Sequence, residues 1–328
     1  MNHFLHPLYL PLADDPTPLS ALSMNRMLHE SISQALKFGI FEQLKTARSY
    51  AEVAELLKFD PQVTYYLLKA LVELGCLAEE DGRFFDTPMA EAYLTKDSCL
   101  YLGHEFTALA GDLFGGLLAK RLKGKNGDKP PEPEWSQERL RQLGVLGLMG
   151  SIQSVVEACS LDNARTFLDL GGGHGYYSIA LVQKYPELKA TVFDLPHIVE
   201  LARAFAKQSE VEGQVGFIGG NFMTDEIGQG YDAVLCANIL HSSKRDIVLN
   251  KVYTALNSDG KIIVKTRVAD APNNLENAFN NLFWQVRGGK ELFTTKQWRG
   301  FLAEHGFRGA KVFNIFGTFA TIIARKEG

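Results

Sequence analysis

The 328-residue sequence has few cysteines, and this scarcity excludes two classes of protein. The four cysteines, Cys76, Cys99, Cys159 and Cys236, are far apart, with no CxxC pair and no cluster of histidines nearby. Such widely spaced cysteines give little support to a disulfide framework or a structural zinc site. We therefore expect no disulfide and no metal, and we expect the cysteines within apolar runs to be small buried hydrophobic residues.

An excess of basic residues is also missing. The chain has 34 Lys and Arg against 38 Asp and Glu, a net charge of −4, which opposes the phosphate neutralisation that nucleic acids require. The one basic stretch, residues 120–129, contains two glycines and is followed by Pro130 and Pro131, so we interpret it as a solvated connector. We expect no nucleic-acid partner.

Long apolar runs are absent too. No segment has the length needed to span a bilayer, and residues 1–18 lack the basic and apolar regions of a signal peptide. The sequence therefore predicts a cytoplasmic protein with no membrane association.

The composition is that of a globular protein, with 46% hydrophobic and 22% charged residues. The length suits two domains. We place a helical domain at residues 1–122, a linker and bridging helix at 123–160, and a second domain at 161–328. The bridging helix is expected over 136–158, because apolar residues recur there three or four positions apart.

The first domain has the pattern of a winged helix. Helices are expected around residues 24–38, 50–57 and 64–74, followed by a hairpin with its turn at Asp81-Gly82. A DNA-binding winged helix carries several basic residues on its third helix, whereas this one carries only Lys69. We interpret it as a packing element, with a metabolite-sensing, DNA-binding regulator as the alternative.

In the second domain, short apolar runs alternate with amphipathic stretches. Strands are expected at 166–170, 190–193, 215–218, 233–237 and 261–265, and helices near 176–185, 198–208 and 246–255. Such alternation predicts a parallel sheet with right-handed crossovers. Two final strands, at 309–314 and 318–324, are separated by a short turn and predict a closing antiparallel hairpin.

A glycine-rich loop follows the first strand of this domain. Gly171, Gly173 and Gly175 allow the backbone to approach a ligand closely and to direct N–H groups at it. The dinucleotide fingerprint requires a further glycine where this chain has Tyr176 and Ser178, which argues against the rival class, an NAD-dependent oxidoreductase.

Two carboxylates flank this loop. Asp169, just before the glycines, favours a ligand with an ammonium group over one with a pyrophosphate. Asp194 ends the second strand, where a carboxylate can accept hydrogen bonds from both hydroxyls of a ribose. The alternative for Asp194 is a cap of the helix that begins near Pro196.

These segments together resemble the small-molecule O-methyltransferases of the caffeic acid and acetylserotonin type. The resemblance rests on Leu168-Asp-Leu-Gly-Gly-Gly-His-Gly, Phe193-Asp-Leu-Pro and Gly288-Gly-Lys-Glu291, and it covers nearly the whole chain. It implies an α/β, Rossmann-like class I methyltransferase domain and a mainly helical winged-helix dimerisation domain. It also implies a homodimer that transfers a methyl group from S-adenosyl-L-methionine to a small-molecule acceptor of secondary metabolism, with S-adenosyl-L-homocysteine as product.

The resemblance also assigns roles to residues. His241, at the end of the fourth strand, would be the general base that removes the proton of an acceptor hydroxyl, and Glu291 would orient its ring. The cofactor pocket would comprise Asp169, Gly171, Gly173, Asp194, Leu195, Asn221, Phe222 and Asn238. The acceptor pocket, suited to a flat aromatic or conjugated molecule, would be lined by Phe106, Phe114, Met149, Phe279, Phe283 and Trp284.

Several positions depart from the family pattern. Ser242 and Ser243 follow His241 where the family has Asp-Trp, Thr266 replaces a second acidic residue, and Asn221 replaces the acid beside the adenine. A base with a single acidic partner would suit an acceptor that is already acidic, such as a phenol or an enol. Methylation of nitrogen or carbon, or use of the cofactor without methyl transfer, is the alternative.

Overall fold

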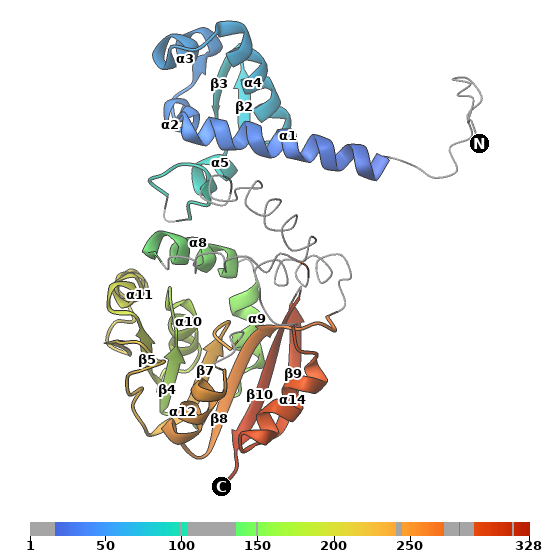
Figure 1. Cartoon of the computed structure of the whole chain (residues 1–328). Coiled ribbons are helices and arrows are strands. Elements are labelled where there is room, and N and C mark those ends of the chain that lie inside the picture. The colour runs from blue at the N-terminus through green and yellow to red at the C-terminus, as the bar shows by residue number, and fades with distance from the viewer. Residues whose placement is uncertain are drawn as a thin grey trace, which may run out of the picture. The chain divides into compact units, whose positions relative to one another are not determined.

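The computed structural model of the chain describes residues 17–98, 100–103, 106, 136–148, 150–240, 245–271, 282, 292–316 and 318–328 (Figure 1). The chain divides into two compact units, residues 1–109 and residues 110–328. The residues predicted to bridge the domains, 136–158, therefore belong to the second unit. The predicted connector at 120–129 and linker at 123–134 lie outside the described residues.

The N-terminal unit consists of helices and one small antiparallel sheet. Its elements are α1 (Thr17–Lys37), α2 (Ile40–Leu44), β1 (Arg48–Ser49), α3 (Tyr50–Leu57), α4 (Pro61–Glu73), β2 (Leu77–Glu80), β3 (Arg83–Asp86) and α5 (Pro88–Tyr93). The strands are ordered β1-β3-β2. This confirms the predicted helices and hairpin of a winged helix. The structure adds α2, β1 and α5, which are too short for periodicity to reveal.

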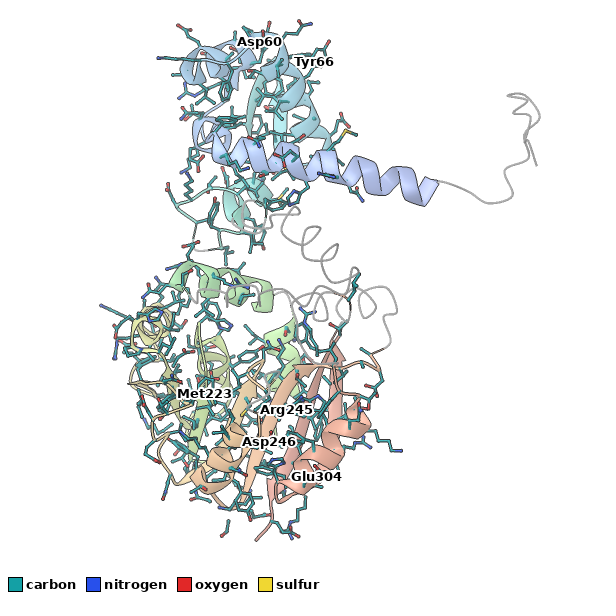
Figure 2. The ribbon with its side chains drawn as sticks, viewed as in Figure 1. Asp60, Tyr66, Met223, Arg245, Asp246 and Glu304 are labelled. Carbon is teal, nitrogen blue, oxygen red and sulfur yellow. The ribbon has the colours of Figure 1, made fainter. Side chains whose placement is uncertain are left out.

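Local side-chain chemistry sets the boundaries of these elements. Ser49 and Glu52 form a capping box at the start of α3. Asp60 accepts the backbone N–H of Val63 over 2.8 Å at the start of α4 (Figure 2). Asp81 and Gly82 have φ of 49° and 73°, the left-handed pair that a two-residue hairpin turn requires.

The outer face of α4 bears on the choice between packing and DNA binding. Val63 and Tyr66 are apolar or aromatic, and they are 66% and 62% exposed. Figure 2 marks the position of Tyr66 on this helix. The ammonium of Lys69 pairs with the Glu79 carboxylate on β2 at 2.6 Å. The basic residue of this helix is thus neutralised within the unit, which supports the interpretation of α4 as a packing element.

The C-terminal unit is built on a seven-stranded sheet ordered β6-β5-β4-β7-β8-β10-β9 (Figure 1). Its elements are α8 (Gln137–Leu148), α9 (Ser151–Ala158), β4 (Thr166–Leu170), α10 (Tyr176–Lys184), β5 (Lys189–Asp194), α11 (Pro196–Gln208), β6 (Val215–Gly219), β7 (Tyr231–Ala237), α12 (Arg245–Ala255), β8 (Leu256–Arg267), α14 (Thr295–Glu304), β9 (Phe307–Phe316) and β10 (Phe319–Lys326). Strand β10 is antiparallel to both of its neighbours, β8 and β9, and the other adjacent pairs of this sheet are parallel. The predicted parallel sheet with a closing hairpin, a class I methyltransferase topology, is confirmed.

Helices cover both faces of this sheet. On one face, α10 and α11 bury Leu181 and Phe205 against the parallel strands, and α9 adds Val155 to the same core and lies against β9 and β10. On the other, α12 buries Leu249 and lies against β8, and α14 adds Trp298 to the same core and lies against β9. Because apolar cores cover both faces of the sheet, polar ligand-binding groups are exposed at the carboxyl ends of its strands.

The prediction of a single helix over residues 136–158 is wrong. Gly150 has φ 124° and separates α8 from α9, which then runs in a new direction from Ser151. Only glycine adopts this conformation without strain. The apolar spacing continues across the break, so periodicity alone did not reveal it.

Three expectations concern the chain as a whole. Within the described segments, no helix combines the length and apolar character that crossing a bilayer demands. Cys76, Cys159 and Cys236 are buried, as their apolar surroundings predict, and Cys99 lies outside the described residues. No three His, Cys, Asp or Glu side chains are grouped to bind a metal ion in the part of the chain that is described.

Candidate functional site

The glycine loop lies at the carboxyl edge of the parallel strands. Strand β4 ends at Leu170, next to the ends of β5 and β7. Gly171, Gly173 and Gly175 all have positive φ, at 66°, 54° and 73°, and the loop leads directly into α10. Ligands of open α/β sheets bind at this edge.

Strand β5 holds the loop in place. The carbonyl oxygen of Phe193 accepts the backbone N–H of Gly171 at 2.8 Å and that of Gly172 at 3.3 Å. The Asp194 carboxylate accepts the N–H of Gly173 at 2.8 Å and that of Leu195 at 2.7 Å, one on each oxygen. Each oxygen keeps a second lone pair, so the carboxylate can still accept two hydroxyl groups. Burial raises the pKa of Asp194, and the two N–H donors counteract that rise.

The contact between Asp194 and Leu195 also bears on the alternative role of Asp194. Leu195 is the N-cap residue of α11, and no side chain caps that helix. The carboxylate of Asp194 accepts the N–H of Leu195 and also that of Gly173 in the glycine loop, and this second contact supports its placement in a ligand site.

Asp169 lies beneath the loop and is fully buried. One of its oxygens accepts the Ser178 hydroxyl of α10 at 3.0 Å, and the other has no hydrogen-bond partner among the described residues. Gly172 packs on this carboxyl group so closely that a Cβ atom there would lie 2.8 Å from Asp169 Cγ. Burial raises the pKa of Asp169 to about 7. Asp169 thus supports the loop, and its direct contact with a ligand stays a prediction.

Two side chains border Gly171. A Cβ atom at this position would lie 2.7 Å from Ile239 Cγ2 and 3.4 Å from Phe222 Cε1, so only glycine fits against these side chains. Lys251 of α12 holds the segment that carries Phe222, because its ammonium donates to the carbonyl oxygens of Phe222 and Asp225 at 3.0 and 2.8 Å. These contacts bring Phe222 to the glycine loop.

The predicted residues Asn221 and Asn238 are both exposed at this edge. The Asn221 side-chain oxygen accepts the N–H of Met223 at 3.0 Å, which fixes a local turn. Asn238 has φ 59°, and its N–H donates to the carbonyl oxygen of Lys265 at 2.8 Å. Both side chains can contact a ligand that lies across the ends of β6 and β7.

Three polar residues near the loop were missed by sequence reasoning: Ser178, His174 and Lys265. Nδ1 of His174 accepts the N–H of Tyr176 at 3.1 Å, and burial lowers its pKa to about 3, so the ring is neutral with the proton on Nε2. Lys265 is buried on β8. The signal that could have revealed it is its place directly after the apolar run Ile262-Ile263-Val264, because lysine is rarely buried without a function or a partner.

The predicted catalytic pair and most of the predicted acceptor pocket lie outside the described residues. These are His241, Glu291, Phe114, Met149, Phe279, Phe283 and Trp284. Phe106 is described and belongs to the N-terminal unit, where its ring lies 5.5 Å from that of His29. Thr266, at the position of the expected second acid, is buried on β8.

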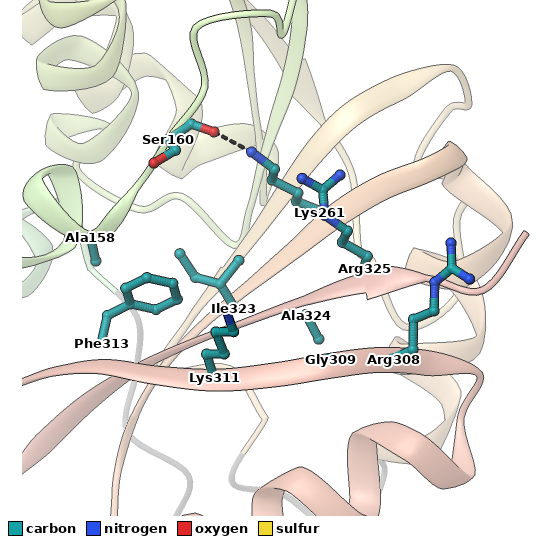
Figure 3. Close-up of a pocket in the computed structure, with 10 residues that line it drawn as sticks. All are labelled: Ala158, Ser160, Lys261, Arg308, Gly309, Lys311, Phe313, Ile323, Ala324 and Arg325. Atoms are coloured by element: carbon teal, nitrogen blue, oxygen red, sulfur yellow. Dashed lines mark hydrogen bonds between the residues drawn. The ribbon is translucent and has the colours of Figure 1, made fainter.

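A separate cavity of about 460 Å³ lies on the sheet beside β9 and β10 (Figure 3). Lys261, Arg325 and Arg308 face one another across β8, β10 and β9, and Asp259 forms ion pairs with the two arginines. The Lys261 ammonium donates to the carbonyl oxygen of Ser160. Lys261 pairs with Ala233, toward the amino end of β7, so this basic cavity is distinct from the edge that carries the glycine loop.

Comparison with known families gives two matches. Residues 147–308 match the family model of an O-methyltransferase domain. Residues 22–96 match that of an O-methyltransferase dimerisation domain. The first segment contains the glycine loop, Asp194 and Asn238, and the second contains the winged helix.

Individual relatives share the whole architecture. The chain is 27% identical to acetylserotonin O-methyltransferase of Bos taurus, over 92% of this chain and 94% of the relative. It is 25% identical to the N,N-dimethyltransferase OxyT of Streptomyces rimosus, over 96% and 98%. The crystal structure of human N-acetylserotonin methyltransferase in complex with S-adenosylmethionine superimposes with a TM-score of 0.77 at 23% identity, covering 97% of this chain and 100% of that one.

Proposed function

The chain belongs to the O-methyltransferase family and is a methyltransferase that uses S-adenosylmethionine, and on that premise we propose that it methylates an oxygen atom of a small aromatic or conjugated metabolite. The observation that carries this proposal is the pairing of the glycine loop with Asp194 at the carboxyl edge of the sheet. His241 is the proposed general base, and Glu291 is proposed to orient it.

The described residues fit the cofactor. The spare lone pairs of Asp194 suit the two ribose hydroxyls. The backbone at Gly171 and Gly173, where positive φ lets the loop approach a ligand closely, suits the methionine part. Asn221, Phe222 and Leu195 are proposed to border the adenine, and Asn238 the methionine part. The cofactor supplies a methyl group on a positively charged sulfur.

The residues of the chain then have two tasks in the reaction. They hold the acceptor oxygen in line with the methyl carbon, and this positioning supplies much of the rate. The C–O bond forms as the C–S bond breaks, S-adenosylhomocysteine leaves, and the acceptor proton passes to the imidazole of His241. A neutral imidazole near pH 7 can take that proton.

Methylation of nitrogen is the second candidate. OxyT, which matches nearly the whole chain, is named as an N,N-dimethyltransferase. Thr266 stands where the family pattern has a second acid, and a nitrogen acceptor depends less on a strong base than an alcohol does. Phenolic and amine acceptors offered with a labelled methyl donor distinguish the two.

A homodimer is proposed from the matched dimerisation domain. The N-terminal unit exposes several large apolar side chains, which a partner subunit would cover. These are Met27, Phe38, Leu56, Val63 and Tyr66. Light scattering should give about twice the chain mass of 36.4 kDa, and a monomer at micromolar concentration would contradict the proposal.

The test of the catalytic proposal is His241→Ala. Turnover should fall about 10²- to 10⁴-fold while calorimetric affinity for S-adenosylhomocysteine is kept, because a general base acts on the acceptor and not on the cofactor. His305→Ala serves as the control, because the His305 ring, directly after α14, contacts the Phe301 carbonyl and the Asp246 carboxylate and none of the described residues proposed for the site. Unchanged turnover in His241→Ala rejects the role of the base.

A further inference from the structure

Lys265 is a buried lysine on an otherwise apolar strand. Its side chain is 6% exposed, and Ile262, Ile263 and Val264 before it are fully buried. An isolated buried ammonium is costly unless it is paired. The groups around its Nζ atom therefore show whether the ammonium has a partner within the described residues.

Aromatic rings and other basic groups surround this ammonium. Nζ lies 3.8 Å from the centre of the Phe319 ring and 6.0 Å from that of Tyr177. Within the described residues it has no hydrogen-bond acceptor and no carboxylate partner. Burial, and secondarily the charge of Arg267, lower the pKa of Lys265 to about 7, and Lys265 in turn helps to lower that of His174. No described anion offsets this positive charge.

Lys265 lies beside the glycine loop. It pairs with Ala237, the last residue of β7, and so lies at the carboxyl edge of the sheet. Ala237 and Ile263, which share its face, pack against the core layer that contains Tyr177 of the first turn of α10. The Tyr177 ring, 6.0 Å from the ammonium, belongs to the second residue after Gly175, the last glycine of the loop, so the ammonium lies near the loop. A cation without a counter-ion therefore borders the methionine end of the proposed cofactor site.

An anionic group, such as a carboxylate, would pair with the Lys265 ammonium. The described acids of this edge, Asp169 and Asp194, suit ammonium and hydroxyl groups, and neither can bind an anion. S-adenosylmethionine carries one carboxylate, at its methionine end. We propose that Lys265 binds the carboxylate of the cofactor. The proposal rests on the proposed placement of the methionine part beside Gly171 and Gly173.

A purely structural lysine predicts a different response to mutation. Replacing an unpaired buried charge by an apolar side chain of similar length is neutral or stabilising. Lys265→Met should therefore fold with an unchanged or higher melting temperature in either case. Lys265→Met should bind the cofactor more weakly than wild type only if Lys265 binds its carboxylate.

The experiment is calorimetric titration of wild type and Lys265→Met with S-adenosylhomocysteine and with decarboxylated S-adenosylmethionine. We expect Lys265→Met to bind S-adenosylhomocysteine about 10- to 100-fold more weakly, the range of one charge-assisted hydrogen bond. Decarboxylated S-adenosylmethionine should bind both proteins equally. Lys265→Gln, which keeps a polar group without the charge, should behave like Lys265→Met, and Lys207→Met, at an exposed site on α11, should behave like wild type.

Two outcomes overturn the proposal. One is an equal loss for both ligands, which indicates a general disturbance of the site. The other is an unchanged affinity for S-adenosylhomocysteine with a raised KM for an acidic acceptor, which assigns the lysine to the acceptor's carboxylate. Absence of O-methylation in wild type that binds S-adenosylhomocysteine would reject only the proposed reaction, because the binding comparison needs no acceptor.

Discussion

Gly173 and Asp194, 21 positions apart in the chain, are joined by a 2.8 Å hydrogen bond from the backbone N–H of Gly173 to Oδ2 of Asp194. The bond connects the glycine loop after β4 to the end of β5. One carboxylate thus holds the loop and offers its remaining lone pairs to a ligand. Loop geometry and ligand affinity are therefore coupled at this residue.

Asp194→Asn should weaken binding of S-adenosylhomocysteine about 10- to 100-fold, because it removes charge-assisted acceptance of both N–H groups and ribose hydroxyls. Isothermal calorimetry measures the loss. Asp162→Asn, on the exposed segment before β4, is the matched control and should bind like wild type. Equal affinity of Asp194→Asn and wild type would remove Asp194 from the ligand site.

Ser178→Ala should destabilise the C-terminal unit by about 1–3 kcal/mol at pH 8.5, because it deprives the buried Asp169 carboxylate of its hydroxyl donor. The effect should shrink at pH 5. With its pKa raised to about 7, Asp169 is neutral in the folded protein at that pH. Urea denaturation at the two pH values tests this, with Ser160→Ala at an exposed site as control. A loss of stability that does not depend on pH would contradict the explanation.

Gly175→Ala should destabilise the protein by about 2–4 kcal/mol. The residue has φ 73°, and a Cβ atom there would lie 2.8 Å from Cβ of Ala202 on α11. Gly213→Ala is the control, because no atom lies within 4 Å of its Cβ position, and it should change stability by less than about 0.5 kcal/mol. Equal melting temperatures for the two variants would show that the α10–α11 contact tolerates a methyl group.

Asp86→Asn should stabilise the N-terminal unit at pH 8. Burial, then the charges of Glu91 and Glu42, raise the pKa of Asp86 to about 7, and neither carboxylate oxygen has a hydrogen-bond partner among the described residues. The folded state therefore retains a proton that the unfolded chain loses near its ordinary pKa of 3.8, and stability falls as pH rises from about 4 to 7.

Each pH unit in that interval costs the wild type about 1.4 kcal/mol, and Asn does not titrate, so the advantage of Asp86→Asn should grow with pH and level off above about pH 7. Chemical denaturation from pH 5 to 8 measures it. Asp81→Asn in the exposed hairpin turn should run parallel to wild type, because Asn tolerates the positive φ there. If the stability difference between Asp86→Asn and wild type does not change with pH, the titration of Asp86 is not its cause.

Sequence reasoning predicted the strands of the C-terminal unit well. Strand β4 and helix α3 were predicted at their observed bounds, and the other strand boundaries lie within two residues of the prediction except the start of β8, which is five residues earlier. Short apolar runs bounded by glycine and charged residues carry that information locally. The break at Gly150 was missed, because a glycine within a helical pattern shows no conformation until the chain is folded.

The site divides in the same way. The glycine loop and Asp194 were found because spacing and residue type are local properties. The contacts of Ser178 with Asp169 and of Lys265 with Phe319 join segments that only packing brings together. The roles of His241 and Glu291 remain predictions from the family pattern.

The sequence by itself determined the two-part organisation, the parallel sheet, the glycine loop and the membership in the O-methyltransferase family, because each is written in short-range patterns. Only the tertiary structure decided which charges are buried. Asp169 is buried beneath the glycine loop. Lys265 is buried at the carboxyl edge of the sheet, and none of the described residues supplies an anion to pair with it. Burial and charge pairing depend on neighbours distant in the chain, and those neighbours set the pKa values and the ligand chemistry of the site.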